Sequence, residues 1–169
     1  MKFGVVVFPG SNCDRDAHYV LHDIMGYETT LLWHKDRDLQ GVDVVVIPGG
    51  FSYGDYLRSG ALAKYSPIME SVTTFATKEE GFVLGICNGF QVLCEAGLLP
   101  GALRPNRNMR FVCKNIYLSP EVKNDLPTAS LRGLKALRIP IAHGEGSYYA
   151  SRETLTHMRN NNQILFRYC

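Results

Sequence analysis

The stretch that decides the fold runs from residue 82 to residue 91 and reads Phe82-Val83-Leu84-Gly85-Ile86-Cys87-Asn88-Gly89-Phe90-Gln91. A short apolar run leads into a Gly-x-Cys-x-Gly turn, after which apolar residues recur with helical spacing. This is the layout of a nucleophile elbow, a sharp strand-to-helix turn that lifts one side chain out of a sheet. Glycines suit such a turn because they leave room where Cβ atoms would collide. The stretch therefore predicts a strand, a tight turn and a helix.

Cys87, at the centre of this turn, is the candidate nucleophile. At a helix N-terminus the unpaired N–H groups and the helix dipole favour the thiolate, which is the reactive form of cysteine. The alternative is an inert core thiol, because free cysteine is among the most frequently buried residue types. The flanking glycines favour covalent catalysis through Cys87.

Strands and helices alternate through the first hundred residues. Strands are predicted at residues 3–8, 28–33, 42–47 and 82–86, and the apolar runs at 3–8 and 42–47 indicate buried strands. Helices are predicted between and after them, at residues 14–25, 67–78 and 88–97. This alternation indicates the α/β class, with an open, mostly parallel sheet and helices on both faces. Ligands of such folds bind at the C-terminal ends of the strands.

The first helix carries two specific predictions. Asp14 or Asp16 is expected to cap its N-terminus, and Gly26 to end it. Its apolar side chains fall on one helical face, which we expect to pack against the sheet: Ala17, Val20, Leu21, Ile24 and Met25.

The pattern changes after residue 109. Further strands are predicted at residues 110–118, 134–142 and 163–168, and Ser151 is expected to cap a short helix before the last of them. We find no internal repeat, low-complexity segment or linker. The sequence is therefore expected to form a single domain over residues 1–169.

The net charge and the length of the apolar runs argue against several classes of protein. A net charge of +2 with scattered basic residues gives no reason to expect a nucleic-acid partner. The longest apolar runs, such as residues 42–47, are too short to span a bilayer, so no membrane partner is expected. The apolar stretch at the N-terminus ends early at Pro9-Gly10, unlike a signal peptide. We therefore expect a cytoplasmic protein.

The cysteine pattern does not indicate a disulfide framework. Their number is odd and their spacing irregular: Cys13, Cys87, Cys94, Cys113 and Cys169. This argues against structural disulfides and a zinc site, and for a reducing compartment. Cys94 and Cys113 are interpreted as core residues. Cys13 lies in a polar loop, and the sequence assigns it no role.

A second motif follows the third predicted strand and reads Pro48-Gly49-Gly50-Phe51-Ser52-Tyr53-Gly54-Asp55. Adjacent glycines let backbone N–H groups approach a ligand closely, and a cysteine that attacks a carbonyl needs donors where the oxyanion develops. The N–H groups of Gly50 or Phe51 and of Asn88 are the candidates. The alternative is a plain turn, because Gly-Gly after a strand is common.

Together these motifs resemble those of class I glutamine amidotransferases, and more closely those of the glutaminase subunits of phosphoribosylformylglycinamidine synthases. Four segments carry the resemblance, which spans residues 1–169: residues 8–14, 48–55, 85–91 and 140–146. The resemblance implies a flavodoxin-like class I glutamine amidotransferase fold.

The resemblance also implies a reaction. The Cys87 thiolate attacks the side-chain amide of L-glutamine, ammonia leaves, and water hydrolyses the thioester. By family likeness Gly50, Phe51 and Asn88 serve the oxyanion hole, and Gln91 shapes the glutamine pocket. The implied partners are an ATP-dependent synthetase subunit of purine biosynthesis and a small accessory subunit. No cofactor or metal is implied on this chain, because ATP and Mg belong to the synthetase.

The sequence departs from the family in one respect. The family's nucleophile works with a His and a Glu in a Pro-His-Pro-Glu segment, which these 169 residues do not contain. We therefore expect a C-terminally truncated chain with low turnover. His143-Gly144-Glu145 is the only His-x-Glu, but it belongs to the segment of residues 140–146, so a structural or interface role is expected for His143.

Two alternatives stay open. Another cysteine hydrolase of similar topology is one; heat-shock protease-like relatives usually place His after the nucleophile, where this chain has Asn88, and dienelactone-hydrolase-like enzymes would not explain the glycine-rich motif. The other is a catalytically incomplete subunit that binds glutamine or regulates a synthetase.

Overall fold

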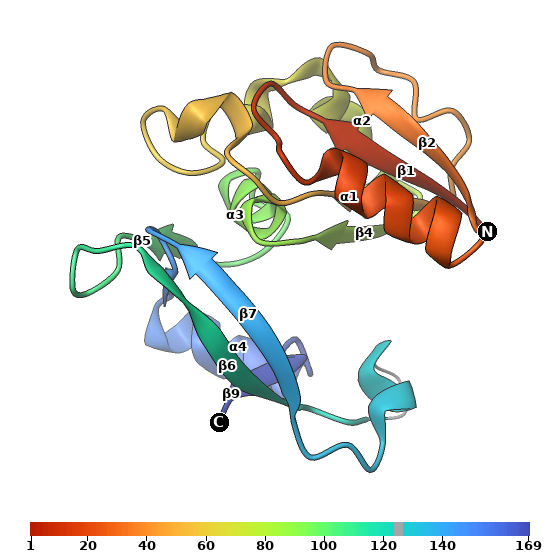
Figure 1. The fold of residues 1–169 in the computed structure, drawn as a ribbon. Coiled ribbons are helices and arrows are strands. Elements are labelled where there is room, and N and C mark those ends of the chain that lie inside the picture. The colour runs from red at the N-terminus through yellow and green to blue at the C-terminus, as the bar shows by residue number, and fades with distance from the viewer. Residues whose placement is uncertain (124–126) are drawn as a thin grey trace. The chain divides into compact units, whose positions relative to one another are not determined.

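The structure, a computed structural model, describes residues 1–123 and 127–169 (Figure 1). The chain divides into two compact units, Met1–Ala102 and Leu103–Cys169. The first unit is built on a parallel sheet with the strand order β2-β1-β3-β4. Its strands are β1 (Lys2–Val7), β2 (Glu28–Trp33), β3 (Val44–Ile47) and β4 (Phe82–Gly85).

Helices pack on both faces of this sheet, as the alternating pattern predicts. On one face, strand residues such as Val45 and Ile47 form the main core with α2 (Pro67–Lys78) and α3 (Asn88–Glu95). On the other face, α1 (Asp14–Tyr19) contributes Ala17 to a smaller cluster around Val5. The α/β class with an open parallel sheet is therefore confirmed, and β2 and α2 have the bounds expected from the sequence.

The first helix differs from its prediction at its N-terminus. Cys13 occupies the N-cap position and makes no side-chain capping bond. Asp14 cannot cap, because its carboxylate accepts from the Ser11 hydroxyl at 2.9 Å and from the Arg15 N–H at 2.7 Å. The prediction of an Asp14 or Asp16 cap was wrong, whereas Gly26 ends the helical segment at a φ of 73° as expected.

The apolar face of that helix was also predicted wrongly. After Tyr19 the helix continues as a π-helical turn, Val20–Ile24. A π turn holds more residues than an α turn, so side chains spaced for an α-helix drift off the packed face. Only Ala17 and Leu21 pack on the sheet, whereas Val20, Ile24 and Met25 are exposed.

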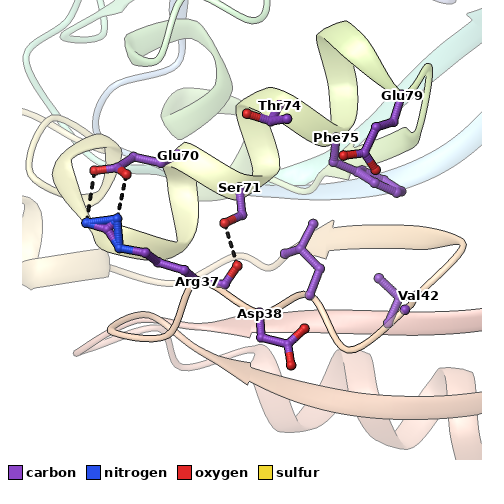
Figure 2. A pocket seen from close by; sticks show the side chains of 10 residues that line it. Arg37, Asp38, Val42, Glu70, Ser71, Thr74, Phe75 and Glu79 are labelled. Carbon is purple, nitrogen blue, oxygen red and sulfur yellow. Dashed lines mark hydrogen bonds and ion pairs between the residues drawn. The ribbon is translucent and has the colours of Figure 1, made fainter.

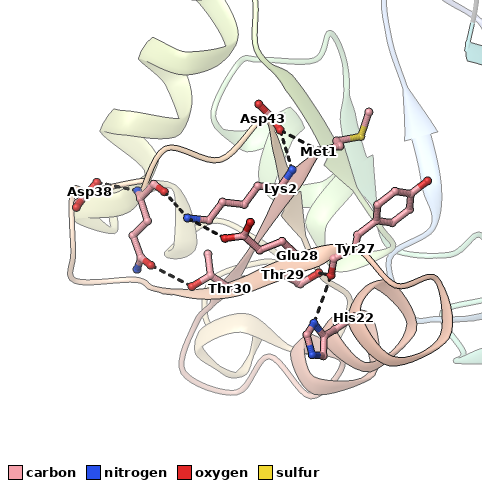
Figure 3. A network of polar contacts seen from close by, with 10 residues as sticks. Met1, Lys2, His22, Tyr27, Glu28, Thr29, Thr30, Asp38 and Asp43 are labelled. Carbon is pink, nitrogen blue, oxygen red and sulfur yellow. Dashed lines mark hydrogen bonds and ion pairs between the residues drawn. The ribbon is translucent and has the colours of Figure 1, made fainter.

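A network of polar contacts links the N-terminal ends of β1 and β2 to the residues just before β3 (Figure 3). The Lys2 backbone N–H donates to Asp43 at 2.7 Å, and its ammonium group donates to the Gln40 carbonyl at 2.8 Å. The same ammonium lies 3.5 Å from a Glu28 carboxylate oxygen on β2. These contacts hold the sheet at the edge opposite the C-terminal strand ends, where a ligand is expected.

The second unit is mainly antiparallel. Its larger sheet has the order β7-β6-β9, with β6 (Val112–Pro120), β7 (Leu137–His143) and β9 (Phe166–Tyr168). A second sheet, which the sequence did not predict, pairs β5 (Ala102–Arg104) with β8 (Ser147–Tyr149). Ser151 caps α4 (Arg152–Asn160) as expected, accepting from the Thr154 N–H at 3.0 Å. The second unit also contains a short 3₁₀ turn, Pro127–Leu131, and the first unit contains two, Ser52–Asp55 and Ala63–Tyr65.

Cys113 was wrongly predicted to be a core residue. It lies on β6, pairs with Ala142 and is exposed. Side chains alternate between the faces of a strand, and Cys113 shares its face with the exposed Tyr117. Cys94 on α3 is buried, as expected.

Within the described residues, no helix has both the length and the apolar character needed to cross a membrane.

Candidate active site

Cys87 lies at a strained turn between β4 and α3. It occupies the N-cap position of α3 with φ 52° and ψ −105°. A non-glycine residue in this region of backbone space costs energy, and such strain clusters at functional sites. The turn has the strand-to-helix geometry of a nucleophile elbow. The Cys87 side chain is exposed, so it is not the inert core thiol that the sequence left as an alternative.

The elbow is tight because two glycines let α3 approach the sheet. A Cβ on Gly89 would overlap the carbonyl oxygen of Ile47 at the end of β3. A Cβ on Gly85 would lie 2.6 Å from the Leu93 side chain, which is closer than packed atoms approach. The Ile86 N–H donates to the Ile47 carbonyl at 3.0 Å and continues the ladder into the turn. These contacts hold Cys87 at the C-terminal edge of the sheet.

The glycine loop, residues 48–55, follows β3 directly and lies beside Cys87. An ideal Cβ built on Gly49 would be 3.5 Å from the Cys87 Cβ. Gly50 has a φ of 120°, and a Cβ there would overlap the backbone N of Asn12. The two motifs found in the sequence therefore meet, because β3 and β4 are neighbouring parallel strands.

The two candidate oxyanion donors of the glycine loop differ in their surroundings. The Phe51 N–H donates to the Gly10 carbonyl at 3.2 Å, which uses this N–H within the loop itself. Gly50 is therefore the remaining candidate of the two expected donors. Asn88 follows Cys87 as the first residue of α3, where backbone N–H groups lack a partner within the helix.

The side chain of Asn88 has a role that the sequence did not reveal. Its amide oxygen accepts from the Ser52 N–H at 3.1 Å, and its amide nitrogen donates to Gln91 at 3.0 Å and to Asp55 at 3.2 Å. Asn88 is only 2% exposed, and Gln91 is also buried. The Asn88 side chain therefore ties the elbow to the glycine loop, and its backbone N–H alone is a candidate for the oxyanion hole.

Cys13 is a second thiol at this site, also missed by the sequence analysis. Its Sγ lies 3.6 Å from the position that a Gly49 Cβ would take, the same position that lies 3.5 Å from the Cys87 Cβ. Burial raises the pKa of the Cys13 thiol, and the nearby charges of Asp16, Cys87 and Asp14 raise it further. No local pattern marks Cys13, because the loop after β1 reaches Cys87 only in the folded sheet.

His143 is held by a buried asparagine within the second unit. The Asn106 amide nitrogen donates to the carbonyl oxygens of Arg110 and His143, both at 2.8 Å, which fixes the orientation of the amide. The amide oxygen therefore accepts from His143 Nδ1 at 3.0 Å and from the Gly146 N–H. A Cβ on Gly146 would overlap the imidazole ring. This packing supports the structural role expected for His143.

His34 is the buried histidine of the first unit. Its Nδ1 lies 2.8 Å from the Tyr53 hydroxyl, which also contacts the Ser66 hydroxyl at 2.8 Å. Burial lowers the pKa of His34. Among the described residues of Met1–Ala102, no histidine is hydrogen-bonded to Cys87.

A hollow of about 450 Å³ runs along α2 but is not the candidate site (Figure 2). Its lining comes from α2, the adjoining Glu79 and the segment of residues 37–42, and includes none of the elbow or glycine loop. The Arg37 guanidinium, its main cation, is bonded to Glu70 at 2.6 Å, and the Ser71 hydroxyl donates to the Arg37 carbonyl at 2.5 Å. Across the described ranges, no group of three or more His, Cys, Asp or Glu is placed to hold a metal ion.

Comparison with known proteins supports the family that the sequence motifs indicate. The model of the CobB/CobQ-like glutamine amidotransferase domain matches residues 1–169. The chain is 56% identical over 168 residues to the phosphoribosylformylglycinamidine synthase subunit PurQ of Trichormus variabilis, which covers 99% of this chain and 75% of that protein. The chain belongs to the PurQ family of glutamine amidotransferases. The PurQ subunit of Moorella thermoacetica is 53% identical to this chain over 169 residues, an alignment that covers 100% of this chain and 71% of that protein.

The PurQ-family assignment extends to the fold. The structure of PurLQS from Thermotoga maritima matches with a TM-score of 0.83 and 39% identity, over 99% of this chain and 74% of that chain. This likeness confirms the class I glutamine amidotransferase fold expected from the resemblance. The match of a glutamine amidotransferase domain over the whole chain also favours this enzyme class over the other cysteine hydrolases considered above.

Proposed function

We propose that this chain is the glutaminase subunit of a phosphoribosylformylglycinamidine synthase and supplies ammonia for purine biosynthesis. Cys87 Sγ attacks the side-chain carbonyl carbon of L-glutamine, and the C–N bond breaks to release ammonia. Water then hydrolyses the thioester to glutamate and frees the thiol. The PurQ relatives and the PurLQS structure support the assignment, and the exposed Cys87 at a strained elbow carries the mechanism.

The oxyanion hole is assigned to the backbone N–H groups of Gly50 and Asn88. They come from the two loops that meet at Cys87, so negative charge on the glutamine carbonyl oxygen would develop between them. Phe51 contributes mainly by placing Gly50, since its own N–H donates to Gly10. Gln91, buried beneath the elbow and bonded to Asn88, shapes the wall of the glutamine pocket.

The ammonia is proposed to be consumed by a synthetase subunit, with a small accessory subunit as a further partner. ATP and Mg are used on the synthetase, and this chain carries no cofactor of its own. A general base must reach the nucleophile for efficient turnover. The Pro-His-Pro-Glu segment that the family resemblance assigns to this task does not occur in the 169 residues. We therefore propose that these residues alone bind glutamine and form the thioester slowly.

A glutamine analogue that carries a diazoketone tests the proposal. The chain is incubated with 6-diazo-5-oxo-L-norleucine, and every cysteine peptide is examined by mass spectrometry. Labelling at Cys87 that L-glutamine suppresses is expected, with Cys113→Ser as a matched control, because Cys113 is also exposed but lies on β6. Labelling that glutamine does not suppress, or no labelling of Cys87, would overturn the assignment.

The same experiment separates the enzyme from a purely regulatory subunit. If Cys87 is labelled and protected but glutamine is never hydrolysed, even with the synthetase present, the chain is a glutamine-binding subunit.

A further inference from the structure

Cys13 and Cys87 come from distant parts of the chain, and both lie beside Gly49. The Cys13 N–H donates to the Gly49 carbonyl at 3.4 Å, which holds the loop after β1 against the glycine loop. The Cys13 Sγ and the Cys87 Cβ lie 3.6 and 3.5 Å from one point, the position of a Cβ on Gly49. Because residue 49 is a glycine, no side chain fills that point.

We propose that Cys13 is a resolving thiol, which forms a disulfide with Cys87 after a hydroperoxide has oxidised Cys87. A disulfide needs the two Cβ atoms about 3.5–4.5 Å apart, so the loop after β1 moves toward the elbow and both side chains turn to face each other when the bond closes. Within the same unit, Cys94 does not offer such a partner, because it is buried within α3 and burial raises the pKa of its thiol to about 11.

The chemistry proceeds in two balanced steps. The Cys87 thiolate attacks one oxygen of the hydroperoxide, the O–O bond breaks, and Cys87 sulfenic acid and an alcohol or water are formed. The Cys13 sulfur then attacks the Cys87 sulfur and displaces the hydroxyl group, which leaves as water with the Cys13 proton. The hydroperoxide is the oxidant, and two thiols have become one disulfide.

The surroundings of the two thiols decide their order of reaction. Cys87 is exposed, so a hydroperoxide reaches it first. Cys13 is only partly exposed and lies near Asp14 and Asp16, whose charges help to keep it in the thiol form. An unreactive thiol next to a reactive one is the arrangement that converts a sulfenic acid into a disulfide instead of a sulfinic acid.

The proposed disulfide blocks the nucleophile reversibly. A thiol reductant converts a disulfide back to two free thiols, whereas it does not reduce sulfinic or sulfonic acids. The inference rests on the reactivity proposed for Cys87, but not on glutamine as the substrate. Labelling by the glutamine analogue without disulfide formation would refute only this inference, and disulfide formation without glutamine-protected labelling would refute only the proposed function.

Hydrogen peroxide and peptide mass spectrometry test the proposal. The reduced chain is treated with increasing peroxide, free thiols are alkylated, and peptides are separated without reductant. A peptide pair joined through Cys13 and Cys87 is expected to predominate, and dithiothreitol is expected to regenerate both thiols. In Cys13→Ser, Cys87 is expected to be oxidised further to sulfinic and sulfonic acid. The fraction of Cys87 that dithiothreitol returns to the free thiol is expected to fall at least tenfold.

Cys113→Ser serves as the matched control, because this exposed thiol lies outside the pair. It is expected to give the same joined peptides as the unmodified chain. The proposal is overturned if Cys87 is oxidised while Cys13 can still be alkylated, or if Cys13→Ser recovers as fully as the unmodified chain. The joined peptide is measured on the unmodified chain, so the test does not depend on the folding of a variant.

Discussion

The amide oxygen of Asn88 accepts a hydrogen bond from the backbone N–H of Ser52 at 3.1 Å. This contact joins the residue after the candidate nucleophile to the glycine loop, 36 residues earlier. Both residues are only 2% exposed, so water cannot replace the bond. This buried side chain therefore helps to fix the position of the glycine loop relative to Cys87.

Replacing Asn88 should loosen the candidate site. Asn88→Ala leaves the Ser52 N–H and the Gln91 side chain without their buried partner, so we expect a loss of about 1–3 kcal/mol in the free energy of unfolding. Urea denaturation measures this loss, and glutamine-analogue labelling of Cys87 should slow in parallel. Asn115→Ala, at an exposed position of β6, is the control and should change stability by less than about 0.5 kcal/mol. Equal effects of the two variants would contradict the role given to Asn88.

The glycines around Cys87 should differ sharply in their tolerance of alanine. A Cβ at Gly89 overlaps the Ile47 carbonyl oxygen, which is backbone and cannot rotate away, so Gly89→Ala should cost about 3 kcal/mol. At Gly49 the nearest atom to a Cβ is 3.5 Å away, an ordinary contact, so Gly49→Ala should cost less than about 1 kcal/mol. Thermal and urea unfolding compare the two variants. If Gly89→Ala were as stable as Gly49→Ala, α3 would not be packed closely against the end of β3.

The Arg58–Glu95 pair should make stability depend on pH. Arg58 donates to both Glu95 oxygens, at 2.6 and 2.7 Å, and these hydrogen bonds lower the pKa of Glu95 below its usual value. A lowered folded-state pKa gives stability that is present above the unfolded pKa and is lost as the pH falls through the folded one. Arg58→Met should therefore cost about 1–2 kcal/mol at pH 7 and much less near pH 3.

The Arg37–Glu70 pair supplies the control for that measurement. It is bonded in the same way, but both side chains are more than half exposed, whereas Glu95 is 9% exposed. Solvent screens exposed pairs, so Arg37→Met should change stability by about 0.5 kcal/mol or less at either pH. Urea unfolding of both variants at pH 7 and pH 3 checks the contrast. An Arg58→Met effect that is independent of pH would refute the explanation.

Turnover by these 169 residues should be low and should not depend on His143. Members of a catalytic triad act as a unit, so the loss of base and carboxylate is expected to lower glutamine hydrolysis by about 10³-fold or more against a longer PurQ relative. His143→Ala should leave this low rate unchanged, because Asn106 holds the ring. It should instead lower the unfolding temperature of the chain. Fast hydrolysis that His143→Ala abolishes would make His143 the catalytic base.

Closure of the proposed disulfide should accelerate as the pH rises. Burial, with the charges of Asp16 and Asp14, raises the pKa of Cys13, so its attacking thiolate becomes more abundant at higher pH. Asp16→Asn removes the charge that raises the pKa of Cys13 most and should speed closure at neutral pH. Stopped reactions at several pH values, followed by peptide mapping, give the rate. A closure rate that does not change between pH 7 and pH 9 would show that Cys13 ionisation does not control this step.

Much of the fold and the centre of the site could be predicted from the sequence. A buried parallel strand is a continuous apolar run, a proline is tolerated at a helix start, and tight turns need glycine, so β3, α2 and the Cys87 elbow followed from local patterns. The glycine loop and the elbow were expected to meet, because the C-terminal ends of parallel strands share one edge of a sheet. The family resemblance agreed with these local signals and extended them to a reaction.

Other features were decided only by the tertiary structure. Cys13 comes close to Cys87 through the folding of the loop after β1 onto Gly49, and no spacing along the chain predicts a contact between residues so far apart. The partners of the Asn88 side chain are likewise set by packing across the sheet edge. The π-helical turn after Tyr19 exposed side chains that a regular helix would have buried. Local sequence determines which turns and strands form, whereas the pairing of distant side chains depends on how the assembled strands bring their loops together.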